Sequence, residues 1–332
     1  MRKWDYVLPL LQNVPPKEEE RVIIEKINDM TAHHNKDNIS RTKAYEAFFY
    51  LHPEIRWSFL ASMVSRNAGW NMTDLESPIF CKLLPKRKRI ELFQTYEKAN
   101  WTIFSDAFPQ LLVYHYSTLC RQKKFHFLRN FFVSEFMISE WEVYWERKLN
   151  NRLLYSLIVN EQNIIEEPLI KHPAYKRNVF KTPVYRLQEL LHLSSVIFPT
   201  RDGELFGGSV VNFTKLQERV QFGKKLALLL FEPVHFEKFL DFSLHQDHTG
   251  SRTDYEKYLS KKPLYTTPWL RLSYPIISHH VHEKEDWSQK RGPTPGWEKS
   301  VAPFKQPNLT EWFFYQRKKL EWFKRIWEFL HG

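Results

Sequence analysis

Glycine is scarce in this chain, and its scarcity excludes whole classes of protein. The 332 residues include 9 glycines, and Gly69 is the only one before Gly203. A glycine-rich phosphate loop or a dinucleotide-binding fingerprint needs several closely spaced glycines, so neither lies in this stretch. A sheet of many strands would also need more turn residues than the stretch contains. The chain before Gly203 is therefore expected to consist of helices and not of a nucleotide-binding α/β fold.

Cysteine and long apolar runs are also lacking. Cys81 and Cys120 could form one bridge at most, which excludes a disulfide-stabilised scaffold. The longest purely apolar run, residues 226–231, is far shorter than the roughly 18 residues that a membrane span needs. Asp5 stands where a signal peptide would need an unbroken apolar stretch. These absences predict a soluble, cytoplasmic protein without a transmembrane segment.

Apolar residues, by contrast, are abundant and recur at helical spacing. Hydrophobic residues make up 42% of the chain and aromatic residues 16%, which is enough to bury a core and excludes a disordered chain. The spacing predicts an all-α fold, a multi-helix globular bundle. Pro53 is placed at the first position of the third helix, and Gly69 just beyond its end. The expected helices cover residues 17–34, 40–50 with Ser40 as N-cap, 53–68, 73–84, 85–106, 108–122, 124–149, 150–170, 182–198, 212–230, 233–244 and 310–330, with a turn or short hairpin at 201–208.

The chain is predicted to divide into four consecutive parts. These are an N-terminal helical segment (1–37), a main helical domain (38–262), a Pro-rich ordered loop (263–307) and a C-terminal aromatic helix (308–332) docked on the body. Seven prolines fall within 263–307, too many for regular structure. The last helix also carries basic residues, a composition that would suit an anionic membrane. Because three glutamates dilute its basic face, docking is favoured and peripheral membrane contact through this helix is not expected.

The third predicted helix leads into a dense set of polar side chains. Its apolar residues cover almost the whole circumference, so the helix is expected to be central and buried. The polar residues near its end are then brought close to the core, where each must be hydrogen-bonded and a buried arginine needs a carboxylate. These residues are Arg66, Asn67, Trp70, Asn71 and Asp74.

Glu161 is a candidate for that carboxylate. It follows Leu154 and Ile158 at helical spacing, so it occupies an apolar face, with Asn160 beside it. A glutamate in such a place is costly unless it is paired, and the expected partner is Arg66 or an arginine earlier in the chain, Arg41. One interpretation is a buried ligand-binding pocket, and the other is a structural ion-pair network that fixes the register of the helices. The residues concerned are Arg41, Arg66, Asn67, Trp70, Asn71, Asp74, Asn160 and Glu161.

Several of these strings also carry a family resemblance. Residues 38–75, 160–162, 185–189, 270–279 and 286–287 together resemble the YppC-like family of uncharacterised bacterial proteins. The resemblance covers most of the chain after the first ~35 residues, and the string at 65–75 is specific and not merely compositional. It implies a bacterial origin, and it assigns no catalytic residue. The polar signature falls where helical spacing already placed the candidate site.

Histidine supplies a second candidate site. His279, His280 and His282 lie close to Glu285 and Asp286. Zinc sites draw on three or four such ligands, usually at fixed spacing. The spacing here matches no standard zinc signature, and the surrounding prolines indicate a surface loop. No metal site and no cofactor are therefore predicted. If the protein does bind a metal ion, His279, His280 and His282 are the candidate ligands.

Basic residues supply a third candidate site. The clusters at 82–89 and 121–124, with a net charge of +11, are compatible with attraction to nucleic acid. No nucleic-acid-binding motif accompanies the charge, and basic runs are often solvated faces. Nucleic acid therefore stays a possible partner on charge alone.

Three classes of function follow from these features. The first is a helical binding protein whose polar pocket takes a small anionic or polar ligand or a protein partner. The second is a hydrolase or transferase in which Glu161 or Asp74 acts as general base and Arg66 stabilises developing negative charge. The third is a nucleic-acid-associated protein. Because the sequence holds no nucleophile elbow and no metal motif, the binding protein is favoured and enzymatic activity stays open.

Overall fold

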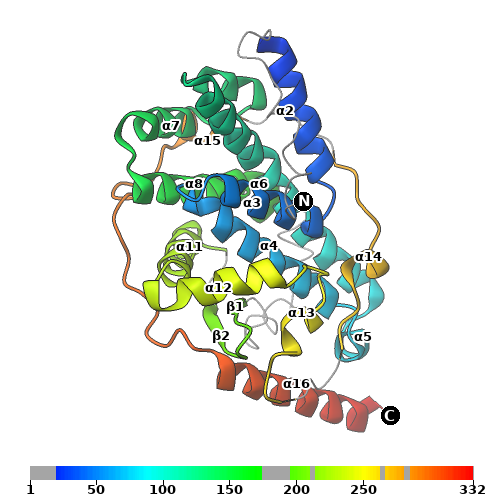
Figure 1. The fold of residues 1–332 in the computed structure, drawn as a ribbon. Helices are drawn as coiled ribbons and strands as arrows, with labels where there is room; N and C mark the ends of the chain where they lie inside the picture. Colours follow the sequence, from blue (N-terminus) through cyan, green and yellow to red (C-terminus); the bar gives the residue numbers. More distant parts are fainter. Residues whose placement is uncertain (1–19, 174–194, 210–213, 262–265, 280–284, 332) are drawn as a thin grey trace. The chain divides into compact units, whose positions relative to one another are not determined.

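The computed structural model describes residues 20–173, 195–209, 214–261, 266–279 and 285–331 (Figure 1). The chain divides into two compact units, each assembled from three separate stretches. Unit 1 comprises Met1–Ser62, Ala99–Glu167 and Ile277–Ser300, and unit 2 comprises Met63–Lys98, Pro168–Ile276 and Val301–Gly332. The parts predicted from the sequence are consecutive stretches, whereas each unit combines stretches that are far apart in the sequence.

The described residues of unit 1 form helices joined by turns and loops, without a strand (Figure 1). The carboxylate of Asp37 caps α3 by accepting a hydrogen bond from the backbone N–H of Ser40 at 2.7 Å, so the cap lies three residues before the expected Ser40. The elements of this unit are α2 (Glu20–His34), α3 (Asn38–Leu51), the first part of α4 (Arg56–Asp74), the later part of α6 (Lys86–Cys120), the short 3-10 helix η1 (Phe125–Phe131), α7 (Glu135–Arg147), α8 (Asn150–Ile164) and α15 (Trp287–Lys290).

Aromatic rings form the core of unit 1. The ring of Tyr45 on α3 lies 5.4 Å from that of Trp57 on α4 and 5.0 Å from that of Phe104 on α6. Further along α6, the ring of Trp141 on α7 stacks 5.3 Å from that of Tyr114. Large rings that pack edge-to-face or offset bury much apolar surface, which explains why an aromatic-rich sequence forms helices that meet through aromatic contacts.

Unit 2 combines helices with one small hairpin (Figure 1). Strands β1 (Ser195–Pro199) and β2 (Leu205–Ser209) pair antiparallel, with Ile197 opposite Gly207. The hairpin packs against three of the helices of this unit, α11, α12 and α16. The helical elements are the later part of α4, α5 (Pro78–Leu83), the first part of α6, α11 (Leu216–Leu230), α12 (Pro233–His245), α13 (Thr253–Glu256), α14 (Leu270–Ser273) and α16 (Thr310–His331), and a π-helical turn η2 (Glu166–Ile170) follows α8 across the boundary between the units.

The all-α prediction is confirmed, and the turn or hairpin expected at 201–208 is present. The helix expected at 182–198 is wrong at its end, because Ser195–Pro199 is a strand. Residues 182–194 lie outside the described residues. Val196, Ile197 and Phe198 have side chains that favour extended backbone, and pairing with β2 decides between the two states.

Other helix boundaries also differ from those expected, among them the start of the third helix, which is Arg56 and not Pro53. The segments 85–106 and 108–122 form one helix, α6, which contains Pro109. The single helix expected at 124–149 is interrupted, because Phe132 adopts a left-handed conformation (φ 57°) and Ser134 caps α7. Helix α4 does not end at Gly69 but continues to Asp74. Pro109 and Gly69 thus lie inside helices, whereas the cap at Ser134 is a local signal that helical spacing does not contain.

The described helices include none that is both long enough and apolar enough to cross a membrane. The Pro-rich segment is ordered at α15, where Trp287 is 6% exposed. At its end, Leu309 N–H donates to the carbonyl of Leu205 at 2.7 Å, so the chain runs along the hairpin before α16 begins. Phe313 and Leu320 of α16 are 6% and 3% exposed.

Candidate functional site

Glu161 lies on α8 of unit 1, and two neutral groups hold its carboxylate. Trp57 Nε1 donates to Oε2 at 3.1 Å, and Gln162 Nε2 donates to Oε1 at 3.1 Å. No lysine, arginine or histidine among the described residues forms an ion pair with it. The residue as a whole keeps partial exposure, although its carboxyl group is enclosed by protein atoms. A carboxylate in this state has acceptor capacity that the described protein does not use.

Enclosure changes the acidity of this group. Burial raises the pKa of Glu161 to about 7, and the hydrogen bonds from Gln162 and Trp57 offset only part of the rise. The carboxyl group therefore exchanges its proton near neutral pH. A group of this kind can accept a hydrogen bond from a ligand in one state and donate one in the other.

Tyr45 lies beside the same tryptophan and is 3% exposed. Its hydroxyl group has no hydrogen-bond partner among the described residues. Burial raises the pKa of Tyr45 well above its usual range, and the charge of Glu161 raises it further, so the hydroxyl stays a neutral donor. Buried polar groups are almost always hydrogen-bonded. An unused donor and an under-used acceptor are thus grouped around Trp57; Tyr45, Trp57, Glu161 and Gln162 are called the Glu161 site below.

The expected pairing of Glu161 with Arg41 is wrong. Arg41 is 1% exposed, and its Nε donates to Asn35 Oδ1 at 2.6 Å while Nη1 donates to Asn38 Oδ1 at 2.8 Å. Amide oxygens from the turn before α3 therefore stabilise the guanidinium locally. No cation offsets the burial of Glu161. Its raised pKa instead leaves the carboxyl group partly protonated near neutral pH, which lowers the cost of burying it.

Asn160 precedes Glu161 and has a different role. Its Nδ2 donates to Asp106 Oδ2 at 2.7 Å. Its Oδ1 accepts from Ser134 Oγ at 3.0 Å and from Trp287 Nε1 at 2.9 Å. One amide thus joins α8 to α6, to the N-terminus of α7 and to the Pro-rich segment, which explains why it is 1% exposed. We assign it to the framework that positions Glu161.

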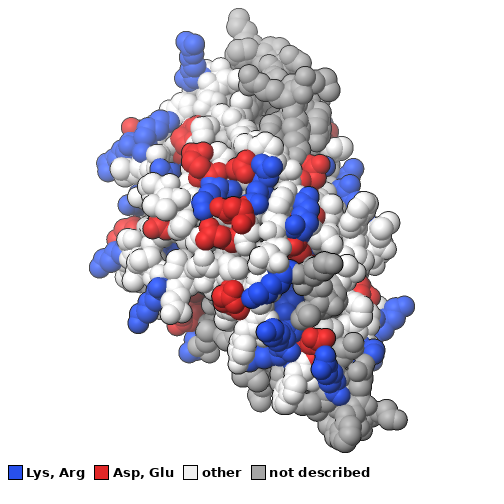
Figure 2. Space-filling view, turned by 60° about the horizontal axis from the view of Figure 1, so that its bottom comes forward, with Lys and Arg blue, Asp and Glu red and all other residues white. Residues whose placement is uncertain are grey.

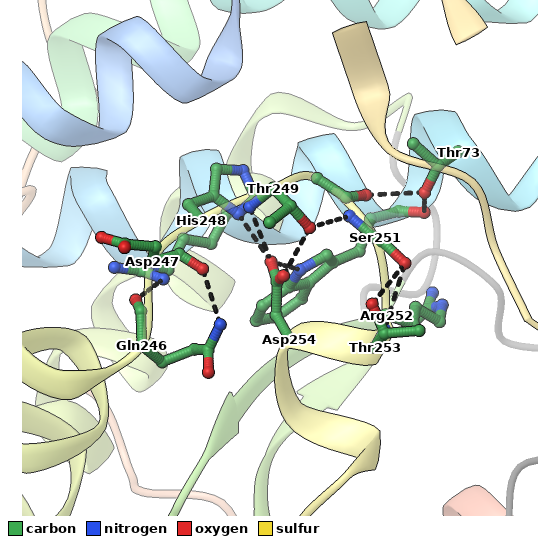
Figure 3. A network of polar contacts seen from close by, with 12 residues as sticks. Thr73, Gln246, Asp247, His248, Thr249, Ser251, Arg252, Thr253 and Asp254 are labelled. Carbon is green, nitrogen blue, oxygen red and sulfur yellow. Dashed lines mark hydrogen bonds and ion pairs between the residues drawn. The ribbon is translucent and has the colours of Figure 1, made fainter. Parts of the chain in front are cut away.

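The remaining predicted site residues belong to unit 2, where a second polar cluster surrounds Asp254 (Figure 3). Asp254 Oδ2 accepts from Trp70 Nε1 at 3.0 Å, from His248 Nδ1 at 3.2 Å and from the N–H of Thr249 at 3.1 Å. Its Oδ1 accepts from Thr249 Oγ1 at 2.5 Å. Burial alone would raise the pKa of Asp254. The hydrogen bond and the charge of His248, together with hydrogen bonds from Thr249 and Trp70, leave the pKa lowered. Four donors saturate this carboxylate, so it fixes the loop against α4.

Asp74 at the end of α4 is engaged in the same way. Arg252 Nε lies 2.7 Å from both of its carboxylate oxygens, and the two side chains are each 8% exposed. The other nitrogens of Arg252 donate to Tyr255 Oη at 2.6 Å and to Asn71 Oδ1 at 3.0 Å. A fork-shaped pair of this kind is strong and specific, and it uses up the acid. Asp74 is therefore a weaker candidate for a general base than Glu161.

Arg66 and Asn67 of α4 bind backbone groups within unit 2. Arg66 Nη1 donates to the carbonyl of Gln246 at 2.9 Å, just beyond α12. The C-terminal carbonyls of a helix are partly negative and unpaired, so they replace the carboxylate that we expected for Arg66, and the predicted pair of Arg66 with Glu161 is wrong. Asn67 Oδ1 accepts from the N–H of Ile197 at 2.7 Å, and its Nδ2 donates to the carbonyl of the same residue at 2.8 Å. The amide thus pairs with β1 as another strand would.

A third polar cluster, in unit 1, was not predicted. His52 Nε2 lies 2.8 Å from His115 Nδ1, and His52 Nδ1 lies 3.1 Å from Glu54 Oε1, which also accepts from Tyr114 Oη at 2.9 Å. An ionised carboxylate only accepts, so His52 Nδ1 donates to Glu54. Burial, with the charge of His52, lowers the pKa of His115 to about 4. We expect His115 to be neutral at pH 7.

The histidines of the Pro-rich segment are only partly described. His279 packs its ring 5.1 Å from that of Trp101 in unit 1, and His280 and His282 lie outside the described residues. Within the described part of the chain, no group of three histidine, cysteine or acidic side chains could hold a metal ion.

Part of the first basic cluster is paired with neighbouring acids. Arg87 Nε and Lys88 Nζ lie 3.1 Å and 2.6 Å from the carboxylate of Glu91. Arg89 is buried, 3.5 Å from Glu76. On the face drawn in Figure 2, basic and acidic side chains lie interspersed. This face does not present the single-sign surface that nucleic-acid binding favours.

Sequence reasoning missed several partners that the fold supplies. Trp57 lies among the apolar residues of the third predicted helix, and Tyr45 was not singled out. Nothing in the spacing marks the indole N–H of Trp57 as the partner of Glu161. Asp254 and Arg252 could have been found, because they lie in the string His-Thr-Gly-Ser-Arg-Thr-Asp at 248–254. Turn-forming residues next to an acid and an arginine often build their own hydrogen-bonded loop.

These features define a helical protein in which neutral donors hold the carboxyl group of Glu161. Residues 33–311 match the family described as "Protein of unknown function (DUF2515)", so the chain belongs to this family. One relative of this chain is a protein of Bacillus subtilis (strain 168) named "Uncharacterized protein YppC". It is 43% identical over 309 residues, which cover 93% of this chain and 96% of the relative. The resemblance inferred from the sequence is thereby confirmed. No solved structure matches the chain.

Proposed function

We propose that this chain is a helical binding protein whose ligand is a small polar molecule held at the Glu161 site. The observation that carries the proposal is the grouping of an under-used carboxylate, Glu161, with an unused hydroxyl donor, Tyr45, around the indole of Trp57. A ligand that both donates and accepts hydrogen bonds would satisfy both groups.

The charge of the site narrows the class of ligand. No cation pairs with Glu161 among the described residues. An anionic ligand would bring like charges together in a poorly solvated place, which is unfavourable. A neutral polyol or an amine can donate to the carboxylate, so the proposal favours these over the anionic ligands that the sequence also allowed.

General acid–base catalysis at Glu161 is a second candidate, and the pKa of about 7 favours it. Proton transfer is most efficient when the pKa of the group lies near the working pH. No nucleophile is described beside the carboxyl group, so binding is the simpler role. The saturated Asp254 and the paired Asp74 are proposed to support the fold of unit 2.

A cytoplasmic location is kept as part of the proposal. Cys81 and Cys120 are both free thiols, which is typical of a reducing compartment.

Thermal melting with defined probes tests the binding function. The probes are putrescine, arginine, glucose and inorganic phosphate, each added to wild type, Glu161→Gln and Tyr45→Phe. We expect a donor-rich probe to stabilise the wild type by RT ln(1 + [L]/Kd), about 2.7 kcal/mol at a hundred times Kd, and to have little effect on either variant. Glu135→Gln, which alters an exposed ion pair with Arg129, is the matched control and should respond as the wild type does. Stabilisation by phosphate alone, by no donor-rich probe, or equally in Glu161→Gln, would contradict the proposal.

A further inference from the structure

A short segment of unit 2 exposes large apolar side chains in an unusual concentration. Trp269, Leu272 and Ile276 are 57%, 80% and 57% exposed, although they are separated by only a few residues. A side chain that keeps 80% of its surface stands out from its surroundings and does not line a groove. Contiguous exposed apolar surface of this kind marks an interaction site more often than single exposed residues do. Residues 266–276 are called the 266–276 ridge.

Two other residues of the ridge, Leu270 and Tyr274, hold it against the rest of unit 2. Leu270 is 3% exposed, and its N–H donates to the carbonyl of Thr249 at 3.0 Å. The ring of Tyr274 stacks 3.7 Å from that of Phe93 on α6, and its hydroxyl donates to the carbonyl of Met72 at 3.1 Å. The exposed side chains are therefore held outward by a fixed backbone. Their exposure is not the fraying of a loose loop.

Positive charge surrounds the ridge. Phe93, against which Tyr274 packs, shares a face of α6 with the exposed Ile90 and Lys86 at helical spacing. Residues 76–91 contain five basic and two acidic side chains, and the ridge itself contains Arg271 and no acid. The exposed apolar side chains thus lie within a region of net positive charge.

We propose that the 266–276 ridge binds the surface of an anionic lipid bilayer. Trp269 lies at the level of the headgroups, because its indole has both an apolar body and an N–H donor, and Leu272 and Ile276 reach the acyl boundary. The exposed Lys86 of α6 and Arg271 of the ridge contact the anionic headgroups. A protruding apolar side chain can enter a soft apolar layer, whereas a protein partner would need a pocket shaped to it. This inference is independent of the proposed ligand at Glu161.

Vesicle sedimentation with the full chain tests the inference. One set of vesicles contains phosphatidylcholine and phosphatidylglycerol in equal parts, and the other contains phosphatidylcholine alone. We expect the chain to sediment with the anionic vesicles, to sediment weakly with the neutral ones, and to be released as salt is raised. Leu272→Asp should weaken binding about tenfold or more, since it places a charge where an apolar group inserts. Lys86→Glu should weaken it several-fold, because each lysine near an anionic surface contributes about fivefold.

Val234→Asp is the matched control, because Val234 on α12 is 74% exposed and lies outside the ridge. Its vesicle binding should equal that of the wild type. All three substitutions alter exposed positions, so the thermal melts should stay within a few degrees and rule out unfolding as the cause. Absence of sedimentation with anionic vesicles would overturn the inference, and so would equal losses in Val234→Asp and Leu272→Asp. Binding that depends on Lys86 and not on Leu272 would also overturn it, since insertion would then play no part.

Discussion

The imidazole ring of His248 lies so close to the backbone of Gly69 that no side chain fits between them. A Cβ atom at residue 69 would lie 2.7 Å from His248 Nε2 and 3.0 Å from Cε1. Gly69 stands in the interior of α4, where glycine is usually unfavourable. At this position the loop of the Asp254 cluster comes closer to the helix than a side chain would allow. The lone early glycine therefore serves a close contact and does not end the helix.

We expect Gly69→Ala to destabilise the protein despite the better helix propensity of alanine. Alanine in a helix interior gains about 1 kcal/mol over glycine, but overpacking a buried contact costs about 1–3 kcal/mol. His248 and Asp254 are held by mutual hydrogen bonds, so the ring cannot move away easily. The free energy of unfolding measured with denaturant should fall by up to about 2 kcal/mol. In the double variant with His248→Ala the two effects should be less than additive, and simple additivity would show that the contact is not the cause.

Glu161→Gln should stabilise the protein at alkaline pH. The folded pKa of Glu161 is about 7 against an ordinary value of 4.5, so the folded state holds an extra proton between these values. The favourable contribution is complete below pH 4.5 and is lost as the pH rises through 7, which amounts to about 3 kcal/mol. Glutamine is neutral throughout and can still accept from Trp57. Denaturant unfolding at pH 5 and pH 8 should show a gain for the variant that grows with pH, and a loss of stability at pH 8 would refute the assignment.

His115 should impose the opposite pH dependence. Its folded pKa of about 4 lies below the ordinary 6.5, so the unfolded chain binds more protons between these values. The contribution to stability is complete above pH 6.5 and is lost as the pH falls toward 4, again about 3 kcal/mol. His115→Asn should flatten the curve of unfolding free energy against pH in this window. An unchanged slope in the variant would show that other groups control it.

Breaking the pair of Arg252 and Asp74 should be costly. Removal of one partner leaves a buried charge, and such losses typically reach about 3–5 kcal/mol. Arg252→Lys keeps the charge but cannot bond both carboxylate oxygens, so a clear part of that loss should remain. Arg129→Gln, at the exposed pair with Glu135, is the comparison and should cost less than about 1 kcal/mol. Equal effects of Arg252→Lys and Arg129→Gln in chemical denaturation would disprove the importance of the buried geometry.

Helical spacing predicted most of the fold, because each amphipathic segment carries its own pattern. It failed where the pattern is short or the decision is made at a distance. Val196 and Ile197 form a strand since Asn67 and β2 supply hydrogen-bond partners that a local pattern cannot show. Pro109 stays inside α6, a position where proline alone would indicate a boundary.

Of the four residues of the Glu161 site, the sequence singled out Glu161 as a candidate but not its partners. The placement of Glu161 on an apolar face identified a costly carboxyl group correctly, and its raised pKa expresses that cost. The partner was wrong because a charge argument considers arginines only, whereas an indole N–H and partial protonation can replace a cation. Asp74 does meet an arginine, Arg252, which lies 178 positions further along the chain. Spacing cannot indicate contacts at that separation.

The assembly of each unit from three separate stretches has a consequence for synthesis on the ribosome. Unit 1 includes residues as late as Ser300, and unit 2 includes the C-terminal helix α16. Neither unit can therefore complete its packing until most of the chain has emerged, although α2, α3 and α4 leave the ribosome early. Their apolar faces therefore lack their packing partners for most of the time that translation takes. During that time these faces must be kept from associating with other chains.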